Sequence, residues 1–135
     1  MEYHIKASSM INHDGAIHIK QSNIDFETTT ITAETLPNPA ELLLGSLSAC
    51  MLKNVQRFSD MMKFSYSKAV VDMSATRLEN PPRMDYIEYD LTIHSSDKKL
   101  NLNLLKKNIE NFGTIYNTIK STCSISGTIK TIKNV

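Results

Sequence analysis

The chain has 135 residues, enough for one domain of ordinary size, and 41% of them are hydrophobic, which suffices for a buried core. Its net charge of +1 provides neither a basic field for nucleic acid nor an acidic surface for cations. The longest apolar stretch, residues 42–52, is too short to span a bilayer, and the first residues lack the features of a signal peptide. We therefore expect a cytoplasmic protein with no nucleic-acid or membrane partner.

The first third of the chain has the composition of strands. Residues 2–10 and 16–32 are rich in Ile, Thr, Phe and His, and they are interrupted by turn signals at residues 14–15 and 22–23. The pattern predicts an antiparallel meander of about three strands.

A long helix is predicted next, from residue 39 to about residue 62. Asn38 is a good N-cap, Pro39 suits the first helical position, and Glu41 completes a capping box. The first half of this helix is apolar on nearly every side, and the second half is amphipathic. This profile predicts a helix whose beginning is buried, and burial between two subunits explains it better than one small sheet does.

The second half of the chain alternates between strand and helix patterns. Residues 65–77 and 84–94 have the alternation of two long strands, joined by a stiff segment with two prolines at 81–82. Apolar residues then recur at spacings of three and four from residue 102 to 119, which predicts a second helix, and residues 125–132 predict a final strand. The order of elements indicates an α+β fold, which we assign to one domain over residues 1–135.

The two cysteines differ in their surroundings. Cys50 lies inside the apolar helical run, and Cys123 follows the end of the second helix. They are too far apart in sequence for CxxC chemistry or a local zinc clip. If the fold brings them together, they form an attacking and a resolving thiol; if it does not, they are two small core residues.

The segments around both cysteines resemble the OsmC/Ohr family of thiol-dependent peroxidases. Residues 38–43 (Asn-Pro-Ala-Glu-Leu-Leu) lead into residues 48–50 (Ser-Ala-Cys), and residues 123–126 (Cys-Ser-Ile-Ser) are similar to the second-cysteine motif of that family, Cys-Pro-Val-Ser. The order of elements fits over essentially the whole chain. The resemblance implies an intertwined homodimer with antiparallel strands packed on two long helices.

The same resemblance implies a peroxidase that reduces organic hydroperoxides. Cys50 then attacks the peroxide and becomes a sulfenic acid, Cys123 resolves it to a disulfide, and a thiol or dithiol reductant regenerates the pair. Two alternatives stay open. The first is a non-catalytic relative that binds a small hydrophobic ligand at the dimer interface, and the second is a structural dimer with two inert cysteines.

Two departures from the family pattern concern the groups that assist the thiol. The chain has no arginine before Arg57, whereas the hydroperoxide branch uses one near its N-terminus. Arg83, held by the double proline, is our first candidate to activate Cys50 from the partner subunit, ahead of Arg77. In the peroxidase branches of the family a functional glutamate lies ten residues before the first cysteine, a position occupied here by Ala40. The resemblance to a less characterised branch, with a glutamate nine residues before the cysteine, makes Glu41 a candidate catalytic residue. However, its position nine residues before Cys50 places it on the opposite side of the helix.

Within the helix of Cys50, three polar residues lie on the same face as the thiol. They are Lys53, Asn54 and Arg57, at i+3, i+4 and i+7. Arg57 reaches the sulfur only with an extended side chain, so we expect a solvated cation there.

No cofactor or metal is expected from the rest of the sequence. The four histidines are scattered without the spacing of metal ligands, and the four glycines form no phosphate-binding loop.

Overall fold

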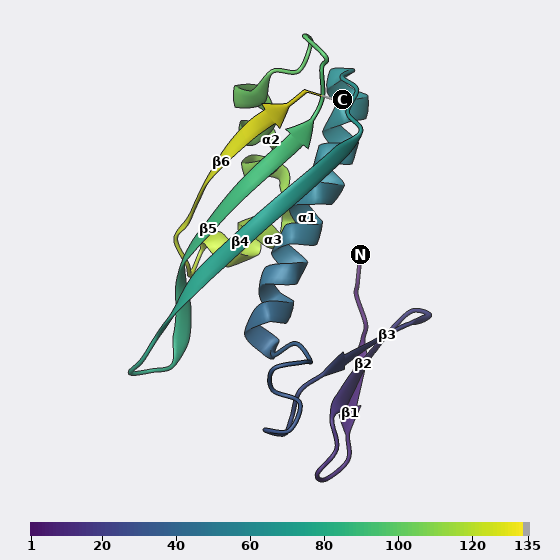
Figure 1. Cartoon of the computed structure of the whole chain (residues 1–135), viewed down its shortest axis with the longest axis vertical. Coiled ribbons are helices and arrows are strands. Elements are labelled where there is room, and N and C mark those ends of the chain that lie inside the picture. The colour runs from purple at the N-terminus through teal and green to yellow at the C-terminus, as the bar shows by residue number, and fades with distance from the viewer. Residues whose placement is uncertain (134–135) are drawn as a thin grey trace. The chain divides into compact units, whose positions relative to one another are not determined.

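A computed structural model of the chain describes residues 1–133 and consists of six strands and three helices within that range. Figure 1 shows the elements in chain order. Residues 1–43 and 44–135 form two compact units, which are described separately below. The assignment of one domain to the chain stays a prediction.

The first unit contains the predicted antiparallel meander. Its strands are β1 (Lys6–Ser9), β2 (Gly15–Ile19) and β3 (Ser22–Phe26), in the order β1-β2-β3. Gly15 lies opposite Phe26 in the ladder, and a Cβ on Gly15 would lie only 2.1 Å from the phenylalanine ring. Glycine at this position therefore makes room for the aromatic ring.

The long helix α1 (Pro39–Met62) has the bounds that the sequence predicts. Its first turn is closed by a capping box in which the Glu41 N–H donates to Asn38 Oδ1 at 2.8 Å and the Asn38 N–H donates to Glu41 Oε1 at 3.0 Å. The capping role expected for Glu41 is thus confirmed. The helix begins in the first unit and continues through the second.

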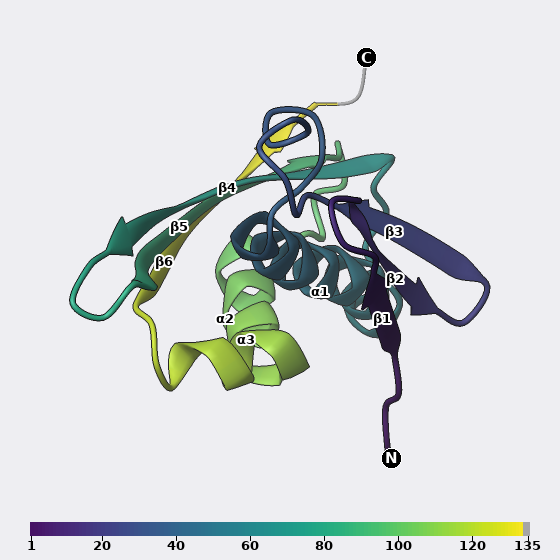
Figure 2. The same ribbon diagram turned by 90° about the horizontal axis from the view of Figure 1, so that it is seen from below.

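The second unit contains a three-stranded sheet in the order β4-β5-β6. β4 (Lys68–Leu78) and β5 (Arg83–His94) are antiparallel neighbours, whereas β6 (Ile125–Ile132) runs parallel to β5. The expectation of antiparallel strands alone was wrong for β6. A parallel neighbour needs a crossover connection, and the helical segment between β5 and β6 provides it. Figure 2 shows that the helices of this unit lie on one face of the sheet.

The second predicted helix is two helices. α2 (Leu102–Phe112) and α3 (Thr114–Lys120) are separated by Gly113, whose φ of −78° and ψ of 119° are extended rather than helical. The expectation of two long helices was therefore wrong, because α1 has 24 residues whereas α2 has 11 and α3 has 7. The apolar spacing of three and four continues across Gly113 because both helices cover the same core.

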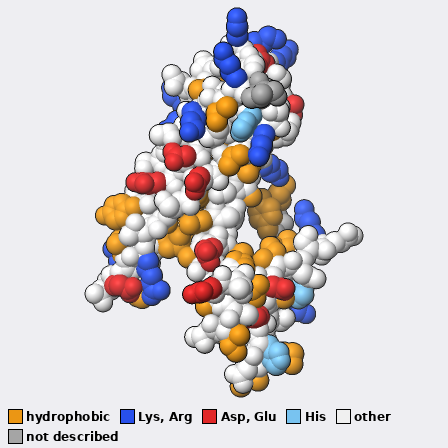
Figure 3. All heavy atoms as spheres, viewed as in Figure 1, with side chains coloured by type: hydrophobic (Ala, Val, Ile, Leu, Met, Phe, Trp, Pro, Cys, Tyr) orange, Lys and Arg blue, Asp and Glu red, His pale blue; other side chains and the backbone are white. Residues whose placement is uncertain are grey.

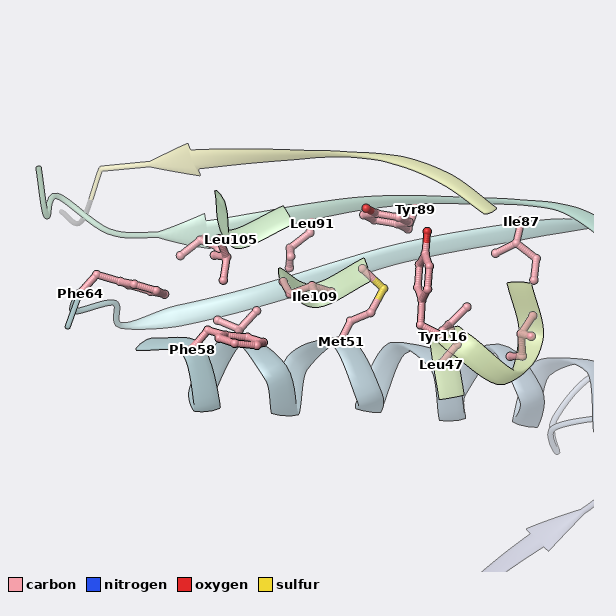
Figure 4. Close-up of a cluster of buried hydrophobic side chains, with 13 residues drawn as sticks. Leu47, Met51, Phe58, Phe64, Ile87, Tyr89, Leu91, Leu105, Ile109 and Tyr116 are labelled. Carbon is pink, nitrogen blue, oxygen red and sulfur yellow. The ribbon is translucent and has the colours of Figure 1, made fainter. Parts of the chain in front are cut away.

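One hydrophobic core lies between the β4–β6 sheet and the three helices (Figure 4). Its fully buried large side chains are contributed by α1, β5 and α2: Leu47, Met51, Val55, Ile87, Leu91, Ile93, Leu105 and Ile109. The alternation of β5 places Ile87, Tyr89 and Leu91 on the core face and Glu88 and Asp90 on the outer face.

The described elements confirm an α+β fold. Among residues 1–133, no helix has both the length and the apolar character needed to cross a membrane.

Candidate functional site

Cys50 is half-buried in the middle of α1. The helix turn around it is anchored by Leu47 and Met51, which are completely or almost completely buried. The Asn54 side chain, one turn further on, is itself only 8% exposed and donates from Nδ2 to Cys50 Sγ at 3.8 Å. A buried amide donor therefore faces the thiol.

Gly113, between α2 and α3, borders the same sulfur. A Cβ at this position would lie 3.3 Å from Cys50 Sγ, and 3.0 Å from both the Ile109 carbonyl oxygen and the Tyr116 Cβ. The backbone angles of Gly113 suit any residue, so lack of space is the reason for glycine here. The break between the two helices thus brings a bare stretch of backbone against the thiol.

A hydrogen-bonded group lies in the same region of the core. The Tyr89 hydroxyl donates to Glu110 Oε1 at 3.0 Å, and Lys106 Nζ approaches the same oxygen at 2.6 Å. In Figure 4 the Tyr116 ring extends toward the Tyr89 ring. Burial and, secondarily, the Glu110 carboxylate raise the pKa of both tyrosines, that of Tyr116 to about 12. Both phenols therefore remain protonated hydrogen-bond donors at neutral pH.

Space for the Tyr89 ring is provided by the neighbouring strand. Gly127 of β6 lies opposite Tyr89, and a Cβ on this glycine would approach the ring to 2.4 Å. The same pairing of glycine and aromatic ring that occurs in the first unit therefore recurs in the second.

Cys123 follows α3 and precedes β6, and it is also half-buried. Its thiol donates to the Met84 carbonyl oxygen at 3.3 Å, and its own N–H donates to the Ile119 carbonyl oxygen at 3.0 Å. The residue is thus held between the end of α3 and the start of β5.

The two sulfurs are both free thiols. Among residues 1–133, the hydrogen-bond partner of Cys50 Sγ is Asn54, and the partners of Cys123 Sγ are Met84 and Thr122. Both thiols are half-buried, Cys123 packs against the core, and no bond joins the two sulfurs. Their roles as attacking and resolving thiols stay predictions.

The three arginines considered as partners of Cys50 contact other groups in the described part of the chain. Arg83 is exposed, and its guanidinium donates to the carbonyl oxygens of Glu79 and Pro81 at 3.4 and 3.3 Å. Arg77 pairs with Glu79 at 3.0 Å, and the guanidinium of Arg57 lies 5.5 Å from the centre of the Phe58 ring. Within residues 1–133, none of these arginines contacts Cys50, so activation by Arg83 from a partner subunit stays a prediction.

The outer face of the β4–β6 sheet is hollowed and acidic. A hollow of about 500 Å³ is bordered by Asp72, Glu88 and Asp90 together with serine and threonine side chains. Figure 3 shows acidic side chains gathered over these strands. Neither cysteine borders this hollow, and residues 1–133 contain no group of three or more His, Cys, Asp or Glu side chains arranged to hold a metal ion.

Several residues around the thiols were missed in the sequence. Gly113 interrupts a helical pattern, which is a recognised signal for a break, although it does not reveal the neighbouring thiol. Glu110 and Tyr116 give no local signal, because they occupy ordinary positions on a helix and their partner Tyr89 is distant in sequence.

The fold and these residues define an α+β protein with two free, half-buried thiols. Residues 32–128 match the family of OsmC-like proteins, so the chain belongs to that family. No functionally curated protein matches the sequence.

Solved structures with the same fold include proteins described as hydroperoxide resistance proteins. An OsmC-like protein from Mycoplasma pneumoniae is 19% identical, with a TM-score of 0.85 over 98% of both chains. An organic hydroperoxide resistance protein from Elizabethkingia anophelis is 13% identical, with a TM-score of 0.73 over 98% of this chain and 99% of that one. One from Legionella pneumophila is 14% identical, with a TM-score of 0.66 over 96% of this chain and 97% of that one. At these sequence identities, the similarity to the solved structures shows the fold alone.

Proposed function

We propose that the protein is a thiol-dependent peroxidase that reduces organic hydroperoxides. The Cys50 thiolate attacks the terminal peroxide oxygen and breaks the O–O bond, which gives the Cys50 sulfenic acid and an alkoxide that takes up a proton to become the alcohol. The Cys123 thiol then attacks the sulfenic sulfur, which releases water and forms the Cys50–Cys123 disulfide. A thiol or dithiol reductant returns both cysteines to thiols by disulfide exchange.

The observation that carries this proposal is the environment of Cys50 Sγ. Cys50 is half-buried, its sulfur accepts a hydrogen bond from the Asn54 amide, and the sulfur lies beside the backbone of Gly113. Its neighbours Leu47 and Met51 are apolar and buried, so the surroundings favour an alkyl hydroperoxide over hydrogen peroxide. Two relatives with the same fold are described as organic hydroperoxide resistance proteins, which supports the same substrate class.

We propose that the active form is a homodimer in the cytoplasm, where a thiol reductant is available. Only Gly15 is buried among residues 1–43, and Tyr3, Ile11 and Ile31 of this unit are at least 80% exposed. A three-stranded sheet with so little of its own core needs a partner surface. Near the start of α1, Leu43 is 40% exposed, and a Cβ on Gly45 would meet no atom within 4 Å.

Sedimentation tests the dimer. At micromolar concentration we expect a mass of twice 15.2 kDa by analytical ultracentrifugation. A monomer under these conditions contradicts the homodimer.

Counting thiols tests the peroxidase activity. The reduced wild-type protein has two thiols, and one equivalent of cumene hydroperoxide is expected to remove both within the time of mixing. The Cys123→Ser variant is expected to lose its one remaining thiol to a sulfenic acid that dimedone traps. Wild-type protein that keeps both thiols contradicts the enzyme.

A second candidate function, ligand binding without catalysis, is favoured because no arginine contacts Cys50 within residues 1–133. Within residues 1–133, Arg83, Arg77 and Arg57 make contacts with groups other than Cys50, whereas peroxide reduction needs a thiolate. A non-catalytic relative that binds a small hydrophobic ligand at the dimer interface has no such requirement. It predicts unchanged thiols after cumene hydroperoxide and protection of Cys50 from alkylation by an apolar ligand.

A further inference from the structure

The start of β5 makes an unusual set of bonds to the segment that carries Cys123. A single oxygen, Asp85 Oδ1, accepts hydrogen bonds from the Ser124 N–H at 2.8 Å, the Ser124 hydroxyl at 3.2 Å and the Tyr86 N–H at 2.8 Å. Hydrogen bonds to an ionised carboxylate are roughly twice as strong as those between neutral groups. One side chain of β5 thus binds both the backbone and the side chain of the residue after Cys123.

The residues on either side of Asp85 bind the same segment. The Met84 carbonyl oxygen accepts from the Cys123 thiol at 3.3 Å, and the Ile87 N–H donates to the Ser124 carbonyl oxygen at 2.9 Å. Every polar backbone group of Ser124 and the thiol of Cys123 are therefore bound to β5. The thiol has no contact of comparable strength within its own segment, because its other partner is the Thr122 hydroxyl at 3.8 Å.

The backbone of β5 is distorted where these contacts are made. The pairing register of the β4–β5 ladder shifts between Ser74 and Thr76, which marks a β-bulge. In the same stretch Tyr86 has a φ of 53°, in the left-handed region that an aromatic residue rarely adopts. The bulge changes the direction of the strand directly after Asp85. Unusual backbone of this kind persists where the surrounding contacts fix it, and the bonds of Asp85 to Tyr86 and Ser124 are such contacts.

Electrostatics support an ionised Asp85. Hydrogen bonds from the Ser124 and Tyr86 backbone lower the pKa of its carboxyl group, and the Arg83 charge lowers it further. Arg83, expected beside Cys50, is therefore an electrostatic neighbour of the carboxylate that binds the Cys123 segment.

We propose that Asp85 is a positioning residue for Cys123, which holds the thiol at the start of β5 for the resolving step. The proposal rests on the proposed peroxidase function for the chemistry of that step, whereas the restraint on Cys123 rests on the structure alone. Loss of the carboxylate frees Ser124 and with it the preceding thiol, so the effective concentration of Cys123 near the Cys50 sulfenic acid falls.

The restraint is tested in chains that carry Cys50→Ser, so that Cys123 is the only thiol. Asp85→Ala is expected to speed the alkylation of Cys123 by iodoacetamide by roughly threefold or more, because several hydrogen bonds to a charged group are lost. Asp85→Asn keeps an acceptor oxygen at the same place and is expected to give an intermediate rate. An asparagine variant that reacts as fast as the alanine variant contradicts the proposal.

The chain offers a matched control in Asp97. Its carboxylate accepts from the Ser65 N–H at 2.8 Å, the Ser65 hydroxyl at 3.3 Å and the Lys99 N–H at 2.9 Å, and it is half-buried like Asp85. Asp97→Ala removes an equivalent set of bonds with no partner near Cys123. It is expected to lower the melting temperature as Asp85→Ala does, but to leave the alkylation rate unchanged. Equal acceleration by both alanine variants overturns the proposal.

The resolving step is tested with both cysteines present. After five equivalents of cumene hydroperoxide, Asp85→Ala is expected to form the Cys50–Cys123 disulfide more slowly than the wild type and to accumulate more dimedone-trapped Cys50. Disulfide formation at the wild-type rate overturns the role of Asp85 and leaves the peroxidase intact. Wild-type protein that is not oxidised overturns the peroxidase, and the alkylation rates then decide the restraint on Cys123.

Discussion

The two cysteines are held in place by different kinds of structure. Cys50 lies within α1, so the hydrogen bonds of its own helix fix its backbone, and one amide a turn away contacts its sulfur. Cys123 lies between elements, and it is fixed by bonds to α3 and to β5, whose residues are 39 positions distant. A helical thiol is therefore positioned by local structure, whereas a thiol between elements depends on the tertiary fold.

This difference suits the proposed division of roles. The attacking thiol needs a fixed environment in which a peroxide can be oriented, and a helix anchored by Leu47 and Met51 provides it. The resolving thiol must approach another sulfur until a bond of about 2.05 Å forms. On our proposal, the bonds of the Cys123 segment to β5 hold that thiol in place for this step.

The largest expected effect separates the two thiols directly. Cys50→Ser is expected to abolish the consumption of cumene hydroperoxide, because the attacking sulfur is lost. Cys123→Ser is expected to allow one turnover and then stop at the sulfenic acid or its further oxidation products. Mass spectrometry after one equivalent of peroxide measures both. Equal oxidation of the two variants removes the assignment of roles.

The next effect tests the fixed environment of Cys50. Gly113→Ala places a methyl group 3.3 Å from Cys50 Sγ and 3.0 Å from the Ile109 carbonyl oxygen. We expect a loss of about 1–3 kcal/mol in the free energy of unfolding, as for overpacked cores, and slower alkylation of Cys50. Urea denaturation and iodoacetamide kinetics measure these effects. Thr114→Ala, at the exposed neighbouring position, is the control and is expected to change neither.

A smaller effect is expected from the amide that faces the thiol. Asn54→Leu keeps the volume of the side chain but removes the donor to Cys50 Sγ. We expect the reaction of Cys50 with peroxide to slow by about 2- to 10-fold, the equivalent of one hydrogen bond of 0.5–1.5 kcal/mol. Stopped-flow measurement of thiol loss at pH 7 tests this.

Asn108→Leu is the matched control for the amide. Its Nδ2 donates to a different sulfur, Met62 Sδ, at 3.6 Å, so the same kind of bond is lost away from the thiol. An equal slowing in both variants means that the Asn54 contact has no specific role.

The smallest effect concerns the pH dependence of stability. In the folded protein the pKa of Tyr116 is raised from 10.0 to about 12, mainly by burial. A raised pKa means that the folded state holds the proton more tightly, so this stabilising contribution is complete below pH 10 and is lost as the pH rises towards 12. Tyr116→Phe is expected to weaken the fall in the urea midpoint between pH 9 and pH 11. Tyr3→Phe, at a position 80% exposed, is the control and is expected to keep the wild-type dependence.

Much of the fold could be predicted because its signals are local. The Asn38–Glu41 capping box, the proline at the first helical position and the alternation of β5 each depend on residues within one turn or one strand. The break at Gly113 could not be predicted from local signals, because an apolar spacing of three and four continues through it. In addition, a larger side chain at this position would meet Cys50, which belongs to another helix. The parallel direction of β6 was missed because strand pairing is not encoded in the pattern of a single strand.

By itself, the sequence determined the helix that holds Cys50, the position of the thiol within it, and the family to which the chain belongs. Only the tertiary structure decided which groups meet the two sulfurs. Asp85 and Ser124 are 39 positions apart, and Gly113 meets Cys50 only because α1 and the α2–α3 junction pack on the same sheet. The physical reason is range: hydrogen bonds within a helix follow from neighbouring residues, whereas contacts between elements follow from how those elements pack.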